Sequence, residues 1–383
     1  MESTASKYSL RDLIVYFLKL GTWGFGGPVA LVGYMHRDLV DTKKWITEDD
    51  YKEGLALSQL APGPLAAQLS IYLGYVHYKI LGATLVGVAF VLPSFLMVLI
   101  IGYTYVLYGG LPWMQAIFYG VGSAVIGIIA IGSYKLTIKS IRTDKLLWII
   151  FLVLAVTTFV TEEEILWVML LAGIVVWFVK APPKWLNSAA YGILPTILLQ
   201  LPVVTTESKL WQIAWFFTKA GAFVFGSGLA IVPFLYGGVV KEYAWLNEQQ
   251  FLDAVAVAMI TPGPVVITVG FIGYLVAGVW GAVVAALATF LPCYLFTVIP
   301  APYFKKYGKH PGIKAFVDGV TAAAIGAIAG AVLVLGKRTL TDIPTLLMAI
   351  TTAAILFKFK KLQEPFIILA AALLGISIKL IFQ

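Results

Sequence analysis

The sequence QLAPGPLAAQ, from Gln59 to Gln68, places a Pro-Gly-Pro bend in the middle of an apolar segment. The same bend returns in MITPGPVVIT, from Met259 to Thr268. Proline removes a backbone donor and disrupts a continuing helix, and glycine adds conformational freedom at the same point. Both segments are therefore predicted to be interrupted helices.

The composition around the two bends is that of a membrane protein. The 383 residues are 60% hydrophobic and 12% charged, with a mean hydropathy of +0.92, whereas a soluble domain carries about 25% charged residues. Apolar stretches such as 81–107 and 278–299 have the length of a membrane-spanning helix. We predict an all-α polytopic membrane protein, and we attribute the net charge of +8 to cytoplasmic loops rather than to nucleic-acid binding.

The chain contains an internal repeat. FLKLGTWGFGGPVALV (17–32) aligns with FTKAGAFVFGSGLAIV (217–232), and the same register aligns the two Pro-Gly-Pro bends. After a shift of one residue, LPSF (92–95) meets LPCY (291–294). A constant register over so long a segment predicts a tandem duplication, with repeats at 1–181 and 207–383 joined by a connecting membrane segment at 182–206.

Loop charges predict that the two repeats have opposite orientations. Basic residues favour the cytoplasmic side of a membrane. When the two repeats are aligned, each basic loop of one repeat corresponds to a less basic loop of the other. The loop 108–115 is uncharged whereas its counterpart carries four lysines, and the acidic loop 162–164 corresponds to the basic segment 358–361. We expect inverted-topology repeats with about 13 membrane segments in total.

Each repeat has two breaks, at 24–28 and 62–64 in the first and at 225–228 and 262–264 in the second. Irregular backbone survives at membrane depth only where it faces protein or a wet cavity. In transporters with inverted repeats, broken helices hold the substrate near the midplane, and helix N-termini attract anions. Whether each broken element spans the membrane or is re-entrant stays open at this stage.

Two lysines lie at the depth of the breaks. Lys19 is about 15 Å along the first predicted helix, and Lys219 occupies the same place in the second repeat. An ionisable residue at this depth is a functional candidate, although a lysine that caps broken-helix carbonyls is the alternative. The polar neighbours of the bends either donate to an anion or satisfy loosened backbone. The candidate substrate-binding residues are Lys19, Gly26, Gly27, Pro28, Pro62, Gly63, Pro64, Gln68, Lys219, Gly226, Ser227, Gly228, Pro262, Gly263, Pro264 and Thr268.

Other chemistry is weakly indicated. The three histidines are far apart and none has metal-ligand spacing, so we expect no metal, no cofactor and no enzyme active site. Acidic residues recur at Glu48 and Glu248 and at Glu53 and Asp253. They are either favourable carboxylates in the first turn of a helix or a proton-linked or gating pair.

The motifs resemble those of the chromate ion transporter family in its fused two-domain form. The resemblance rests on FLKLGTWGFGGP, LAPGPLAAQLSIYLGY and LPSF in the first repeat, and on FTKAGAFVFGSG, ITPGPVVITVGFIGY and LPCY in the second. It implies a carrier that exports chromate, or the isosteric sulfate, across the prokaryotic plasma (inner) membrane and confers chromate resistance.

The resemblance has one departure and leaves alternatives. Trp23 stands where the family often has a small hydroxyl residue, and a bulky ring there would narrow the site. The alternative functions are a passive anion channel and an uptake carrier for a sulfate-type oxyanion. The expected partners are a small inorganic oxyanion and the lipid bilayer, with a homodimer as one possible assembly and no nucleic acid.

Overall fold

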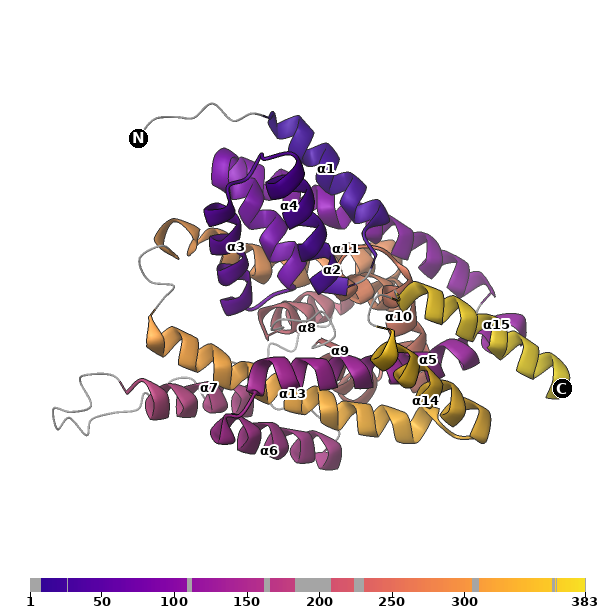
Figure 1. Ribbon diagram of the computed structural model, residues 1–383. Helices are drawn as coiled ribbons and strands as arrows, with labels where there is room; N and C mark the ends of the chain where they lie inside the picture. Colours follow the sequence, from indigo (N-terminus) through magenta and orange to yellow (C-terminus); the bar gives the residue numbers. More distant parts are fainter. Residues whose placement is uncertain are drawn as a thin grey trace.

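The computed structural model describes residues 8–25, 27–108, 112–161, 166–182, 208–223, 231–304, 310–359, 362 and 364–382. Within these ranges the chain is helical and has no strand (Figure 1). The first half contains α1 (Leu10–Trp23), α2 (Gly27–Met35), the π-helical η1 (His36–Thr42), α3 (Glu48–Leu60), α4 (Leu65–Tyr108), α5 (Pro112–Ile141), α6 (Lys145–Thr161) and α7 (Leu166–Lys180). The predicted connecting segment lies almost wholly outside the described residues.

The second half repeats this order of elements. It contains α8 (Lys209–Phe223), α9 (Ile231–Tyr236), the π-helical η5 (Gly237–Glu242), α10 (Glu248–Ile260), η6 (Val265–Ile267), α11 (Thr268–Val298), η7 (Ala301–Tyr303), α13 (Pro311–Thr339), α14 (Ile343–Lys358) and α15 (Glu364–Phe382). Within the described ranges, four helical segments are long and apolar enough to cross a membrane, at Leu65–Tyr108, Trp113–Ile141, Val265–Tyr303 and Pro311–Thr339. The prediction of an all-helical polytopic membrane protein agrees with this architecture.

The Pro-Gly-Pro bend of the first half is the tip of a helical hairpin. Gly54 in α3 lies against the ring of Tyr72 in α4, so that a Cβ on Gly54 would come within 2.9 Å of the Tyr72 Cε1 atom. These residues are equally distant in sequence from Gly63, as expected for antiparallel arms on either side of the bend. The broken element that contains the bend at 62–64 therefore folds back on itself.

A second reversal follows within α4. Lys79 has φ 53° and ψ −142°, outside helical geometry, and Gly74 lies directly against Gly82. In a straight helix, residues eight positions apart are separated by about 12 Å. The chain therefore turns at Lys79 and returns along residues 80–108. In the second half α11 turns in the same way at Ala277–Gly278, where Gly273 contacts Gly281.

Each half packs one long helix against helices of the other half. The helix α5 packs against α14 and α15 of the second half, while α13 packs against α6 and α7 of the first (Figure 1). The two long helices also contact each other, with Gly122 near Thr339 and Gly336 near Ile126. These pairings run in opposite sequence directions, so α5 and α13 are antiparallel.

Glycines make the exchanged contacts close. A Cβ on Gly120 of α5 would overlap the carbonyl oxygen of Ala371 in α15, and a Cβ on Gly319 of α13 would lie 2.6 Å from the carbonyl oxygen of Ala172 in α7. Gly120 aligns with Gly319 and Ala172 aligns with Ala371, so the contact occurs twice with its partners exchanged. Small residues at these positions in α5 and α13 thus allow close helix packing.

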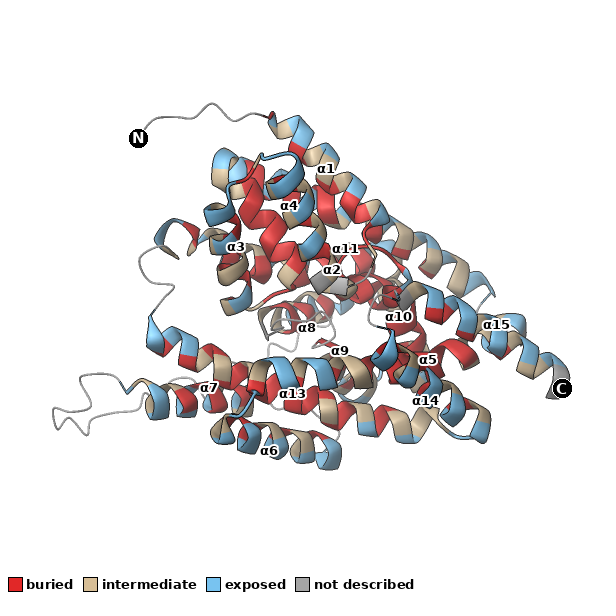
Figure 2. Ribbon diagram, in the orientation of Figure 1, coloured by how far each residue is buried: buried red, intermediate tan, exposed pale blue. Residues whose placement is uncertain are grey.

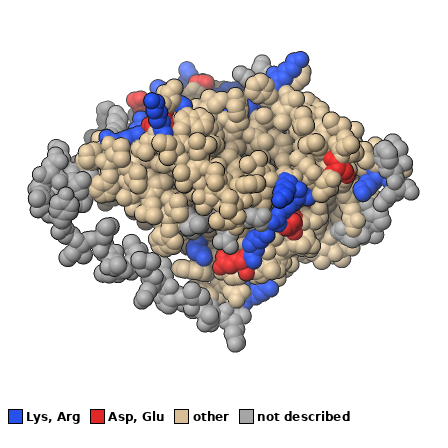
Figure 3. Space-filling view, turned by 90° about the horizontal axis from the view of Figure 1, so that it is seen from below, with Lys and Arg blue, Asp and Glu red and all other residues tan. Residues whose placement is uncertain are grey.

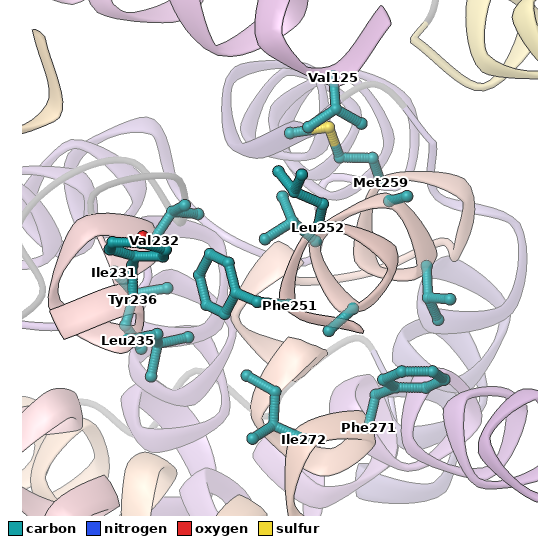
Figure 4. Packing of buried hydrophobic residues seen from close by; sticks show 14 of the residues in the cluster. Val125, Ile231, Val232, Leu235, Tyr236, Phe251, Leu252, Met259, Phe271 and Ile272 are labelled. Carbon is teal, nitrogen blue, oxygen red and sulfur yellow. The ribbon is translucent and has the colours of Figure 1, made fainter. Parts of the chain in front are cut away.

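Burial is concentrated where the halves meet. Residues 251–259 of α10 are all buried, whereas α6, α14 and α15 each expose one apolar face (Figure 2). Figure 4 shows Phe251 and Leu252 of α10 among side chains of α9, α11 and α5. Large exposed apolar residues such as Trp280 and Leu380 remain on the outside. Charged side chains are sparse on the face in Figure 3, which suits a lipid-facing surface.

Candidate functional site

The bend of the second half docks on the first break of the first half. Gly24 directly follows α1, and its carbonyl oxygen accepts a hydrogen bond of 3.0 Å from the backbone N–H of Gly263. Gly263 has φ 91°, which favours glycine, and a Cβ at this position would overlap the Ser94 hydroxyl. Two interruptions far apart in the sequence thus meet in space.

The bend of the first half makes a matching contact with the second. Gly63 has φ 143°, and a Cβ there would lie 3.1 Å from the sulfur atom of Cys293. Cys293 in LPCY is the counterpart of Ser94 in LPSF. Each bend therefore packs against the corresponding small residue of the other half. The alignment of LPSF with LPCY in the sequence did not predict this contact.

The second proline of each bend immediately precedes the restarting helix. Pro64 immediately precedes α4, and its carbonyl oxygen accepts a hydrogen bond of 3.0 Å from the Gln68 N–H. Pro264 immediately precedes η6 in the same way. At the other break, α2 begins at Gly27 with Pro28 as its second residue. Gly26, Gly226, Ser227 and Gly228 lie outside the described residues.

The polar side chains at the bends mainly satisfy loosened backbone. Thr268 donates to the Val265 carbonyl at 2.8 Å, and Thr261 donates to the Val257 carbonyl at 3.0 Å. Gln68 is fully buried and uses its Nε2 group on the Pro62 carbonyl at 2.7 Å. Its Oε1 atom has no hydrogen-bond partner in the described part of the chain. Gln68 alone of these three residues retains an unused polar atom.

Lys19 lines an open pocket of about 670 Å³ on the outer face of α1. The wall continues to Trp23 and Gly24, so the pocket reaches the junction with the second-half bend. Trp23 is 77% exposed on this wall and does not plug the break. The residues that line the pocket are Arg11, Asp12, Val15, Tyr16, Lys19, Leu20, Trp23, Gly24, Tyr34, Arg37, Asp38, Lys43 and Trp45.

The charge of this pocket favours an anion. Four cationic side chains line it against two carboxylates, and both carboxylates already accept hydrogen bonds. Asp12 accepts from the Ser9 hydroxyl at 2.7 Å, and Asp38 accepts from the Arg37 guanidinium at 2.8 Å. The other three cationic residues have no carboxylate within ion-pair distance among the described residues; they are Arg11, Lys19 and Lys43. Arg11 and Lys43 were not predicted from the sequence.

Lys219 lies in different surroundings from Lys19. Its ammonium group is 5.8 Å from the centroid of the Trp215 ring, and it is absent from the lining of the charged pocket. The equivalent region of the second half is filled by aromatic side chains. Phe216 stacks on Phe234 at 5.1 Å, and Gly238 stands where the first half has Asp38, which leaves room for the Phe216 ring.

The cationic residues of the pocket are thus a feature of the first half alone. Trp211, Gly237 and Tyr243 align with Arg11, Arg37 and Lys43. The two lysines are equivalent in sequence but not in environment. A metal site is not indicated either, since no group of three candidate ligands occurs in the part of the chain that was described.

The family model for chromate transporters matches residues 11–177 and again residues 211–376. The chain belongs to the chromate transporter family. The two matches cover the two halves, so the family resemblance predicted from the break motifs is confirmed.

Several family members are similar over nearly the whole chain. The chromate transport protein of Cupriavidus metallidurans is 70% identical over 97% of this chain and 94% of its own length. A probable chromate transport protein of Synechococcus elongatus is 65% identical over 96% of this chain and 95% of its own length. The chromate transport protein of Pseudomonas aeruginosa is 30% identical over 98% and 94% of the two chains. No solved structure matches.

Proposed function

We propose that the protein is a carrier that exports chromate, or the isosteric sulfate-type oxyanion, across the prokaryotic plasma (inner) membrane and so confers chromate resistance. The observation that carries the proposal is the meeting of two breaks at the end of a cationic pocket, through the hydrogen bond between Gly263 and Gly24. Membership of the chromate transporter family supports the substrate class.

The proposed route begins in the pocket of the first half. Arg11, Lys19 and Lys43, which have no carboxylate partner among the described residues, raise the local concentration of a dianion there. At the end of the pocket Gly24 has no side chain, so the anion can approach the backbone of the break closely there. Lys19 lies further along α1 than Arg11 and closer in the chain to Gly24, and it is assigned the contact that passes the anion toward the bends.

We infer an inverted arrangement of the two repeats, 1–181 and 207–383, joined by 182–206. The antiparallel pairing of α5 with α13 supports it, because a two-fold axis that relates antiparallel helices lies perpendicular to them. The exchanged contacts of Gly120 and Gly319 support the same axis. Inverted repeats are a common basis of alternating access, which favours a carrier over a channel.

Export is consistent with the membrane potential. Moving one charge across a membrane is worth about 2.3 kcal/mol per 100 mV, so a dianion leaving a negative-inside cell gains roughly 4–5 kcal/mol per 100 mV. Uptake of the same dianion would work against this energy. The membrane potential therefore favours export of the dianion. Transport measured in vesicles with a known orientation of the protein tests this direction.

The first prediction concerns the pocket lysine. Purified protein in proteoliposomes is expected to exchange radiolabelled chromate by saturable counterflow. Lys19→Ala should raise the half-saturating chromate concentration roughly 10-fold or more, because hydrogen bonds to charged groups contribute about 1.5–3 kcal/mol. Lys219→Ala should have the smaller effect because its ammonium group lies outside the pocket.

Lys145→Ala, which removes an exposed lysine at the start of α6, is the matched control and should behave as the unmodified protein. Equal saturation curves for Lys19→Ala and Lys145→Ala would remove Lys19 from the binding site. Large single-channel currents without counterflow would instead indicate the passive channel.

A further inference from the structure

Asp253 is a buried acid at the interface between the halves. It lies in α10 with 3% of its surface exposed. One carboxylate oxygen accepts a hydrogen bond of 2.7 Å from the Tyr105 hydroxyl, and the other accepts one of 2.8 Å from the Gln249 side-chain amide. Tyr105 belongs to α4 of the first half, so this carboxyl group connects the two repeats.

No cation balances this carboxyl group among the described residues. Tyr105, its titratable neighbour, is covered by Phe118 of α5 at 5.5 Å and by Phe271 of α11 at 5.3 Å. The other elements packed on α10 present apolar side chains to the shared core, including Val125 and Ile368.

Several charged groups on α10 and on those neighbouring elements have other partners. Glu248, at the start of α10, pairs with Arg338 of α13. Lys241 of η5 lies over the Tyr236 ring at 6.0 Å. Lys379 of α15 lies over the Tyr119 ring of α5 at 5.0 Å, and Lys135 of α5 donates to the Leu356 carbonyl.

The hydrogen bonds around Asp253 are compatible with both the ionised and the neutral form of its carboxyl group. A carboxylate accepts from Tyr105 and Gln249 as observed, and a neutral acid can donate to the oxygen atom of either group. Burial without a cation disfavours the charged form. A proton can therefore bind and leave this site without repacking of the core around it.

The position of Asp253 links it to the anion route. The helix α10 runs from Asp253 to its end at Ile260, about 10 Å along the helix axis, and the bend that contains Gly263 follows directly. Gly263 in turn binds Gly24 at the end of the cationic pocket. Because α10 is buried along this length, a change at Asp253 is transmitted to the bend by a rigid element.

We propose that Asp253 is a proton-binding site whose protonation and deprotonation are coupled to oxyanion movement, so that a proton enters as the anion leaves. This inference rests on the proposed carrier function. In this exchange both charges move with a negative-inside potential, because the cation moves in and the dianion moves out.

The first repeat supplies a matched control. Glu53 aligns with Asp253 but lies only half-buried on α3, beside Tyr72 of α4. The neighbouring surface of α3 is open, with Lys52 exposed. Glu53 therefore lacks the enclosure that makes Asp253 a proton site.

The test uses the full-length protein in proteoliposomes with radiolabelled chromate. Counterflow is measured at equal pH on both sides. Accumulation is measured with the membrane potential clamped at zero and a pH difference of one unit, for which exchange of one proton per anion gives roughly tenfold accumulation. Chromate protonation is identical in all samples, so comparison between variants isolates the titration of the protein.

Asp253→Asn is expected to retain counterflow at the wild-type rate and to lose accumulation driven by pH. Glu53→Gln should retain both. Tyr105→Phe should move the pH midpoint of chromate flux upward, because the carboxylate loses a donor that stabilises its charged form.

Normal pH-driven accumulation in Asp253→Asn would overturn the inference. If that variant does not fold, an unmoved pH midpoint in Tyr105→Phe overturns it instead. Counterflow in the unmodified protein without any response to the pH difference would also reject the proton site. Absence of counterflow in the unmodified protein would contradict the carrier function itself.

Discussion

At the scale of single residues, the site depends on positions that tolerate no side chain. Gly63 and Gly263 occupy left-handed backbone regions at the tips of the two bends. Each lies against a small residue of the opposite half, Cys293 for Gly63 and Ser94 for Gly263. The sequence identified both glycines as helix breakers. It did not identify their partners, because the partners are brought near by tertiary packing.

The prediction at this scale is that Gly263→Ala is destabilising. An alanine there combines a positive φ with overlap on the Ser94 hydroxyl, and strained backbone costs on the order of 1–3 kcal/mol. We expect a lower thermal unfolding midpoint in detergent and reduced chromate exchange. Ser94→Ala in the same chain should restore part of the midpoint, because it removes the atom that overlaps.

The control is Gly33→Ala, in α2, where a Cβ meets no atom within 4 Å. Alanine favours a helix over glycine by about 1 kcal/mol, so this variant should be as stable as the unmodified protein or more so. A midpoint for Gly263→Ala as high as that of Gly33→Ala would show that the bend is not strained by a side chain.

At the scale of elements, the fold is held by helices that pack on the opposite repeat. The helix α5 lies on α14 and α15, and α13 lies on α6 and α7. Glycines of α5 and α13 make these contacts close, as at Gly120 and Gly319. Which helices would receive them was not predictable, since small residues fit any close partner.

Gly120→Ala is predicted to weaken this exchanged packing. Its Cβ would overlap the backbone carbonyl of Ala371, and overpacking of this kind costs typically 1–3 kcal/mol. Gly122→Ala, two residues further along the same helix, meets only the Thr339 methyl group at 3.6 Å and should be tolerated. Thermal unfolding of both variants in detergent measures the difference. Equal loss of stability in both would mean that helix geometry, and not the α15 contact, is responsible.

At the scale of the whole molecule, the two repeats are similar in fold and unequal in surface. Both present a bend to the other half, and among the described residues the cationic pocket is lined by the first half. In the second, Phe216 and Phe234 stack in the corresponding space. The proposed anion route is thus asymmetric: the first half contributes the cationic pocket, and the second half has aromatic side chains in the equivalent position.

The prediction at this scale concerns sidedness. In a Cys293→Ala background, single cysteines at Lys139 and Lys314 should react with a membrane-impermeant thiol reagent from the same side. These positions lie at the end of α5 and the start of the antiparallel α13. Cysteines at Trp113 and Ile343 should react from the other side. The basic residues near Lys139 place the first pair in the cytoplasm. Labelling of the cysteines at positions 139 and 314 from opposite sides of the membrane would contradict the inverted arrangement.

The sequence by itself determined the helical membrane class, the duplication, the family and the positions of the breaks at 24–28, 62–64 and 262–264; the predicted break at 225–228 lies outside the described residues. These features depend on composition, repeated motifs and the backbone chemistry of proline and glycine, all of which act locally. The inverted orientation and the roles of Lys19 and Lys219 remain predictions. Only the tertiary structure decided that the Pro-Gly-Pro bend of the first half is a hairpin tip, that Gly263 meets Gly24, and that Asp253 is enclosed while Glu53 is not. The physical reason is that helices apolar on every side carry no periodic signal that separates a protein-facing surface from a lipid-facing one.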